Sequence, residues 1–81
     1  MNVREILVQW NGFRFSVRQV NLLRRIAENG YVVDAGMDKT IAAPLVNEGL
    51  LQRNHVMDTI TATAKGRDIL RGMGFRIRGE Q

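Results

Sequence analysis

The sequence predicts a small α+β domain, mostly helical, with a two- to three-stranded antiparallel sheet. Three observations lead to this fold class. The chain has 81 residues, well below the length at which chains divide into separate cores, so we expect a single domain over residues 1–81. An amphipathic segment of helical periodicity follows Ser16. Further along, two short runs typical of strands flank a loop at residues 54–57, as in a β-hairpin.

Residues 3–15 are compatible with two local structures. Val3, Ile6, Leu7 and Trp10 fall on one face of a helix, which the pair at residues 11–12, Asn-Gly, would end. The same pair, flanked by β-branched and aromatic residues, is typical of a hairpin with a type I′ turn. We favour a helix over residues 3–9 and keep the hairpin over residues 6–15 as the alternative.

The segment after Ser16 is the clearest helix. Ser16 and Gln19 have the spacing of a capping box, in which each side chain accepts from the backbone N–H of the other residue. Apolar residues then recur at helical spacing up to Ala27, and Asn29 with Gly30 supplies the stop. After this helix we expect a short β-like run at residues 31–33 and a turn at residues 34–36. Four aromatic side chains are expected in the core: Trp10, Phe13, Phe15 and Tyr31.

A second helix is expected over residues 39–48. Asp38 would be its N-cap, and Gly49 would be the left-handed residue that ends it. Pro44 lies beyond the first turn and removes one backbone hydrogen bond, so the helix either kinks at Pro44 or restarts near residue 42.

The last third of the chain predicts a hairpin followed by a helix. Residues 50–53 and 58–62 would be its two strands. Thr63 would cap a helix from residue 64 to about residue 73. Residues 75–81 are then a tail, and its last three residues are expected to fray.

The order of these elements resembles a winged helix-turn-helix domain. Residues 49–53, Gly-Leu-Leu-Gln-Arg, and residues 59–70, which contain Thr-Ala-Lys-Gly-Arg, are similar to the wing and the following helix of regulators of the MarR and PadR types. The resemblance covers residues 16–71. It implies a recognition helix over residues 39–48 that enters the major groove of DNA, and a wing loop at residues 54–57 that touches phosphate or the minor groove.

The charge of the chain favours the same partner. Twelve Lys and Arg against eight Asp and Glu give a net charge of +4, and the cations are mostly arginine, whose planar fork suits phosphate. We therefore predict a small transcriptional regulator that binds double-stranded DNA, with arginines of the first helix as additional phosphate clamps. The residues expected to contact DNA are Lys39, Thr40, Asn47, Arg53, Asn54, His55, Lys65 and Arg67.

A protein-interaction module is the alternative function. Residues 31–62 carry a net charge of −2, because Lys39 and Arg53 are outnumbered by Asp34, Asp38, Glu48 and Asp58. A small phage-type or accessory protein could use this acidic segment to bind a host protein complex, with Asp38 and Glu48 as contacts. A second copy of the chain is a further candidate partner, since a dimer would present two DNA half-sites about 34 Å apart.

Missing residue types exclude several other function classes. Cysteine is absent and His55 is the one histidine, so disulfides, cysteine-bearing zinc sites and Ser-His-Asp arrangements lack their residues. There is no Gly-rich phosphate loop of the Walker kind. We therefore expect no catalytic residues, no metal, no other cofactor and no enzymatic activity. No apolar run reaches the roughly 18 residues of a membrane span, so we expect a cytoplasmic protein without membrane contact.

Overall fold

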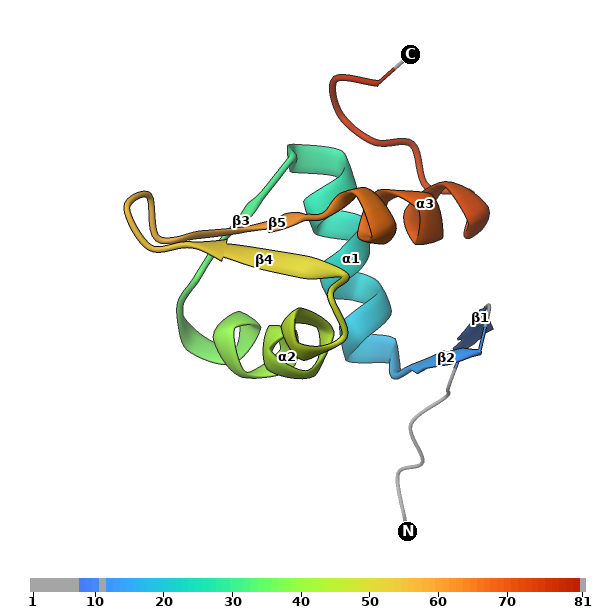
Figure 1. Cartoon of the computed structure of the whole chain (residues 1–81), viewed down its shortest axis with the longest axis horizontal. Helices are drawn as coiled ribbons and strands as arrows, with labels where there is room; N and C mark the ends of the chain where they lie inside the picture. The colour runs from blue at the N-terminus through green and yellow to red at the C-terminus, as the bar shows by residue number, and fades with distance from the viewer. Residues whose placement is uncertain (1–7, 11, 81) are drawn as a thin grey trace, which may run out of the picture.

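Three helices and a three-stranded antiparallel sheet make up the body of the protein, which confirms the predicted α+β class. The computed structural model describes residues 8–10 and 12–80. In chain order the elements are β1 (Val8–Trp10), β2 (Phe13–Phe15), α1 (Val17–Asn29), β3 (Val32–Val33), α2 (Gly36–Asn47), β4 (Leu51–Asn54), β5 (Thr59–Ala62) and α3 (Ala64–Gly72). Helix α1 crosses the middle of the molecule and contacts α2, α3 and the sheet (Figure 1).

The N-terminal segment forms the hairpin that the sequence allowed as an alternative. Trp10 lies opposite Phe13 in the antiparallel pair β1–β2, so the helix favoured for residues 3–9 is wrong at residues 8 and 9, while residues 3–7 lie outside the described residues. Gly12 has a φ of +83°, which glycine adopts at little cost, and the turn therefore prevails over the helical spacing. Phe15 is buried and joins the hairpin to the core.

Helix α1 begins and ends where the sequence predicts. The Ser16 hydroxyl accepts from the Gln19 N–H at 3.2 Å, and the Gln19 side-chain oxygen accepts from the Ser16 N–H at 2.9 Å. At the other end Gly30 is left-handed, and its N–H donates to the carbonyl of Ile26 at 2.7 Å. The buried face of the helix consists of Leu22, Leu23, Ile26 and Ala27.

Helix α2 starts earlier than predicted and is continuous. It begins at Gly36 with Ala35 as its N-cap, and no side chain caps it. The expected cap at Asp38 is therefore wrong, because Asp38 lies within the first turn of the helix. Pro44 stands inside the helix without interrupting it, so the restart near residue 42 is also wrong.

The end of α2 is a Schellman motif built on Gly49. Its N–H donates to the carbonyl of Val46, and the N–H of Leu50 donates to the carbonyl of Leu45, both at 3.0 Å. Gly49 has a φ of +78°, which confirms its predicted role as the left-handed residue. The chain is thereby turned directly into the hairpin β4–β5.

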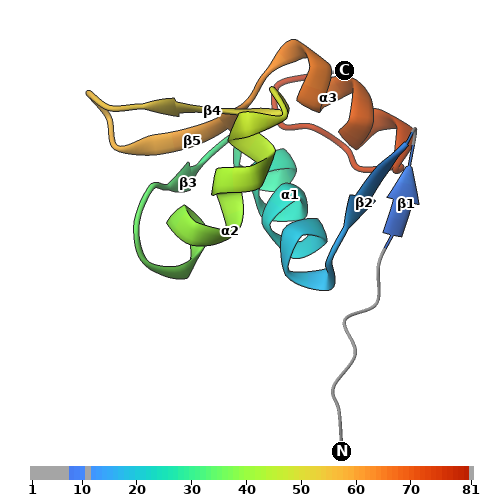
Figure 2. The same cartoon turned by 60° about the horizontal axis from the view of Figure 1, so that its bottom comes forward.

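The three-stranded sheet has the order β3-β5-β4 and is antiparallel throughout. The predicted strands at residues 50–53 and 58–62 are confirmed with small shifts at their ends. One face of the sheet turns to the helices and is buried, with Val32, Leu51, Ile60 and Ala62 as its core side chains. The tip of β4–β5 extends beyond the helices, at the end of the molecule opposite the β1–β2 hairpin (Figures 1 and 2).

Helix α3 is fixed to this hairpin by its first turn. The Thr63 hydroxyl accepts from the Gly66 N–H at 3.0 Å, which confirms the predicted cap, and the Thr63 N–H donates to the carbonyl of Leu50 at 3.0 Å. A Cβ atom on Gly66 would lie 1.9 Å from the oxygen of that same carbonyl. Only glycine fits at this contact between α3 and the backbone of Leu50.

The chain after α3 packs back onto the body. Ile77 is buried, and the Arg78 N–H donates to the carbonyl of Ala27 in α1 at 2.7 Å. The Glu80 carboxylate accepts two hydrogen bonds from Arg71, at 2.8 and 2.7 Å. The fraying expected for residues 79–81 is therefore wrong at Glu80, and residue 81 lies outside the described residues. Among the described residues no helix has both the length and the apolarity to cross a membrane.

Candidate nucleic-acid interface

The residues predicted to contact DNA fall into an exposed group and a group whose side chains already have partners within the protein. The exposed group lies on α2 and at the tip of the β4–β5 hairpin and consists of Lys39, Thr40, Asn47 and His55. The second group lies on β4 and α3 and consists of Arg53, Asn54, Lys65 and Arg67. The structure thus brings about half of the predicted residues to the surface as open side chains.

Arg53 bridges the hairpin and α2. Its guanidinium donates to the Asp34 carboxylate and, at 3.1 Å, to the backbone carbonyl of Lys39. The side chains of Arg53 and Asp34 are only 18% and 8% exposed. Arg53 therefore holds β4 against the start of α2, and its guanidinium is not presented to a ligand.

Asn54 organises the loop at the tip of the hairpin. Its side-chain oxygen accepts from the backbone N–H groups of Val56 and Met57, at 3.0 and 3.1 Å. Asp58 completes the turn with a φ of +52°, a conformation that aspartate tolerates better than most residues. The loop is thus shaped by its own hydrogen bonds and presents His55 and Val56 to solvent.

Lys65 and Arg67 leave the first turn of α3 in different directions. The Lys65 ammonium lies 3.3 Å from the carbonyl of Glu48 at the end of α2 and 5.2 Å from the centre of the Phe13 ring. Arg67 instead donates to the carbonyl of Ala62 at 2.9 Å and lines a hollow that contains no residue of α2. Lys65 therefore belongs to the surface around α2, and Arg67 does not.

The acidic middle of the chain is largely neutralised by the fold. Arg25 of α1 donates to both carboxylate oxygens of Asp38, at 2.8 and 2.7 Å. These hydrogen bonds hold the pKa of the Asp38 carboxyl below its ordinary value and raise the pKa of Arg25. Asp34 is paired with Arg53, so Glu48 and Asp58 remain as the exposed carboxylates of this segment. Counting charges along the chain missed this pairing because Arg25 comes from another helix.

The arginines of α1 differ in the same way. Arg18 and Arg24 are exposed, and Arg24 lies 4.0 Å from Glu28 one turn further on. Arg25 is engaged with Asp38. Two of the three predicted phosphate clamps on α1 therefore keep their side chains at the surface.

An exposed apolar area beside β3 was missed from the sequence. Tyr31, expected in the core, is 51% exposed, and Val33 and Met57 are 57% and 67% exposed. Phe15 is buried as expected, Phe13 is half-buried, and the side chain of Trp10 lies outside the described residues. The exposure of Tyr31 and Val33 follows from strand alternation, because the side chains on either side of the buried Val32 must point to the opposite face of the strand.

Neither a metal site among the described residues nor a known relative adds to this description of the surface. In the part of the chain that the structure describes, no group of three or more His, Cys, Asp or Glu residues is placed to hold a metal ion. In comparisons with known proteins, the chain matches no protein-family model, no curated protein and no solved structure.

Proposed function

We propose that this chain is a small winged-helix DNA-binding protein, a transcriptional regulator in which α2 enters the major groove and the β4–β5 loop touches the backbone. The observation that carries the proposal is the bridge made by Arg53. It joins β4 to Asp34 and to the backbone of Lys39. A helix and a hairpin that must contact DNA together lose less entropy on binding when they are already held as one unit.

The open face of α2 has side chains suited to this role. Thr40 and Asn47 are about two turns apart on one face of the helix, and Lys39 lies at its margin. Lysine supplies charge for phosphate, while threonine and asparagine can bond to phosphate or base edges. Lys65, close to the end of α2, adds a second cation to this surface.

The test is binding of the purified protein to a labelled mixed-sequence duplex, followed by fluorescence anisotropy. Binding is expected to weaken at least about tenfold between 50 and 200 mM salt if several phosphates are contacted. Lys39→Ala is expected to weaken binding further. Arg76→Ala is the matched control, because it removes one exposed charge from the tail, where Arg76 lines a hollow with Arg71, Phe75 and Glu80.

Two results would contradict the proposal. One is the absence of binding at about 50 mM salt, where phosphate contacts are strongest. The other is an equal loss with Lys39→Ala and Arg76→Ala, because binding would then depend on overall charge rather than on α2.

A protein-interaction module remains the second candidate. The exposed apolar side chains of Val56 and Met57 at the hairpin tip favour it, since such side chains gather at protein contacts. If the contact is acidic, Glu48 is the better residue to test, because Asp38 is bound to Arg25. A module of this kind would keep its partner after Lys39→Ala and lose it after Glu48→Ala.

A further inference from the structure

Strand β3 has a free edge. Among the described strands it pairs only with β5. The Asp34 N–H donates to the carbonyl of Asp58 at 2.8 Å. In this register the backbone N–H and C=O groups of residues 32 and 34 point towards β5. Peptide groups alternate between the two sides of a strand, so those of Tyr31 and Val33 point away from β5. The Val33 carbonyl already accepts from the Ala35 N–H at 2.9 Å, so a chain laid along this edge would find the Val33 N–H and the backbone groups of Tyr31.

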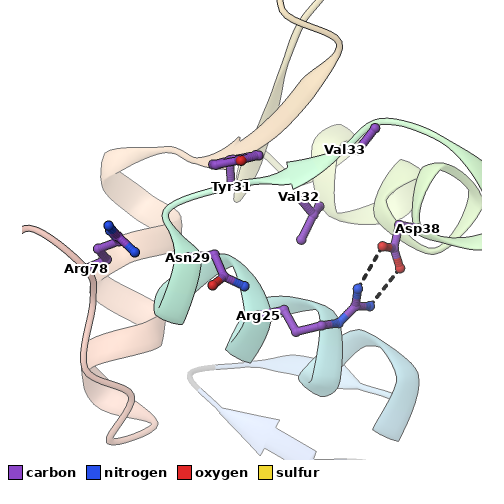
Figure 3. A pocket seen from close by; sticks show the side chains of 7 residues that line it. All are labelled: Arg25, Asn29, Tyr31, Val32, Val33, Asp38 and Arg78. Atoms are coloured by element: carbon purple, nitrogen blue, oxygen red, sulfur yellow. Dashed lines mark hydrogen bonds and ion pairs between the residues drawn. The ribbon is translucent and has the colours of Figure 1, made fainter.

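A hollow of about 560 Å³ runs along this edge. Figure 3 shows β3 on one side of it and α1, with Asn29, on the other. Arg78 stands at one end, and the Arg25–Asp38 pair stands at the other (Figure 3). A second hollow of about 750 Å³ adjoins it on the outer face of the sheet and shares four lining residues with it, Asn29, Tyr31, Val33 and Arg78. The lining of the two hollows therefore follows β3 from Arg78 to the Arg25–Asp38 pair, as a site for an extended chain requires.

The apolar side chains beside this edge offer contacts to such a chain. Tyr31 and Val33 are more than half exposed, and Met57 of the hairpin loop lies in the same lining. Exposed edge strands are usually protected by being very short or by lysine, proline or a bulge, and of these β3 has only its short length of two residues. Residues 31–33, Tyr-Val-Val, include none of the protecting side chains.

The charge of the residues that line the hollow indicates which charge a docked segment would carry. Within residues 8–10 and 12–80, the Arg78 guanidinium has no hydrogen bond and no ion pair. The carboxylate in the lining, Asp38, is held on both oxygens by Arg25. The hollow thus has one uncompensated positive charge. A second copy of this protein would bring another Arg78 to the contact and no open carboxylate from the same surface.

We infer that the free edge of β3 docks an extended, acidic and apolar segment of a partner protein. The segment adds a strand beside residues 31–33, lays apolar side chains on Tyr31, Val33 and Met57, and directs a carboxylate to Arg78. This surface is separate from the proposed DNA contact, because Lys39, Thr40, Asn47 and His55 line neither hollow. The inference stands whether or not the protein binds DNA.

The experiment is a titration of the ¹⁵N-labelled full chain with a capped hexapeptide of alternating valine and glutamate, followed by NMR. This method detects dissociation constants of about 1 mM, which suits a short probe. The amide signals of residues 29–33 and 78 are expected to shift and saturate. A peptide of alternating valine and lysine should shift them much less.

Two variants separate the Arg78 contact from a general charge effect. Arg78→Glu is expected to weaken binding about fivefold or more, as loss and reversal of one exposed ion pair would do. Arg76→Glu makes the same charge change two residues away, lines neither hollow, and should change binding less than twofold. Both side chains are exposed, and the amide spectrum reports that each variant is folded.

Three outcomes would overturn the inference. The first is no shift at residues 29–33, or shifts that both variants reduce equally. The second is a concentration-dependent shift of these signals without peptide, with a doubled mass in light scattering, which would assign the edge to a second copy. The third is stronger binding of a single-stranded oligonucleotide at the same residues, which would assign it to nucleic acid.

Discussion

Gly66 is the residue on which the position of α3 depends most directly. A side chain there would meet the carbonyl oxygen of Leu50 at 1.9 Å, and this carbonyl also accepts from the Thr63 N–H. Gly66→Ala must therefore shift the helix or break that contact, and overpacking of this kind costs about 1–3 kcal/mol or more. The measurement is urea unfolding followed by circular dichroism.

Gly72→Ala is the matched control for this prediction. Gly72 is exposed at the last position of the same helix and has no positive φ. Alanine there is expected to raise the free energy of unfolding by about 0.4–1 kcal/mol, because it restricts the unfolded chain. Equal destabilisation by the two variants would show that α3 does not require close contact at Gly66.

The Arg53–Asp34 pair is the second prediction at this scale. Because both side chains are nearly buried, removal of either partner leaves the other without its counter-charge. Arg53→Ala or Asp34→Ala is expected to lower the free energy of unfolding by about 3 kcal/mol, and the double variant should cost less than the sum. Arg24→Ala, which opens the exposed pair with Glu28, should cost about 0–1 kcal/mol. Additive effects of Arg53→Ala and Asp34→Ala would contradict the bridge.

At the scale of elements, the contact between α1 and α2 includes a pH-sensitive pair. The hydrogen bonds from Arg25 hold the pKa of the Asp38 carboxyl below its ordinary value of 3.8. The stabilisation is therefore present above about pH 4 and is lost as the pH falls through the lowered pKa. Asp38→Asn is expected to flatten the fall in stability between about pH 4 and pH 2, measured by urea unfolding at each pH. Arg25→Gln removes the same hydrogen bonds and should flatten the curve as well, and an unchanged slope in both variants would contradict this account.

The C-terminal tail is a structural element although it contains no helix or strand. Ile77 is buried, and the backbone of Arg78 is bonded to α1. Ile77→Ala is expected to lower the free energy of unfolding by about 2 kcal/mol, at the low end for a buried aliphatic side chain in a small core. Arg76→Ala, one residue earlier and exposed, should leave stability within about 0.5 kcal/mol. Equal stability of the two variants would show that the tail is not part of the core.

The elements that could be predicted are those determined within a few residues of sequence. The capping box at Ser16, the cap at Thr63 and the left-handed Gly49 each depend on local hydrogen bonds, and all three are confirmed. The start of α2 was misplaced because Asp38 fits the pattern of a cap as well as that of an ion-pair partner. The choice between these roles depends on Arg25, which a local pattern cannot place.

The candidate site was less predictable for the same physical reason. An arginine, a lysine or an asparagine suits phosphate equally well whether or not the fold has already used it. Arg53 is held by Asp34 in the loop before α2 and Asn54 by backbone N–H groups of its own turn, whereas Lys39 and Asn47 remain exposed. Sequence alone identified residues capable of contact, and packing decides which of them are open.

At the scale of the whole molecule, the exposed cations are spread over several surfaces, and Arg18 and Arg24 lie on α1. Lys39 and Lys65 surround α2, while Arg76 and Arg78 belong to the tail. A DNA complex formed through α2 therefore neutralises few phosphates. Since each contact contributes about −0.9 to the slope of log K against log salt concentration, we expect a slope of about −2 for one protein molecule on DNA.

The salt titration separates this mode of binding from a nonspecific one. Lys39→Ala is expected to reduce the slope by about one, because it removes one phosphate contact, whereas Arg78→Ala should leave it unchanged. At about −0.9 per contact, a slope of −4 or steeper with the mass of a monomer would mean that arginines away from α2, on α1 or in the tail, also reach DNA. Such a result would assign binding to positive charge spread over the surface of the protein rather than to a contact centred on α2.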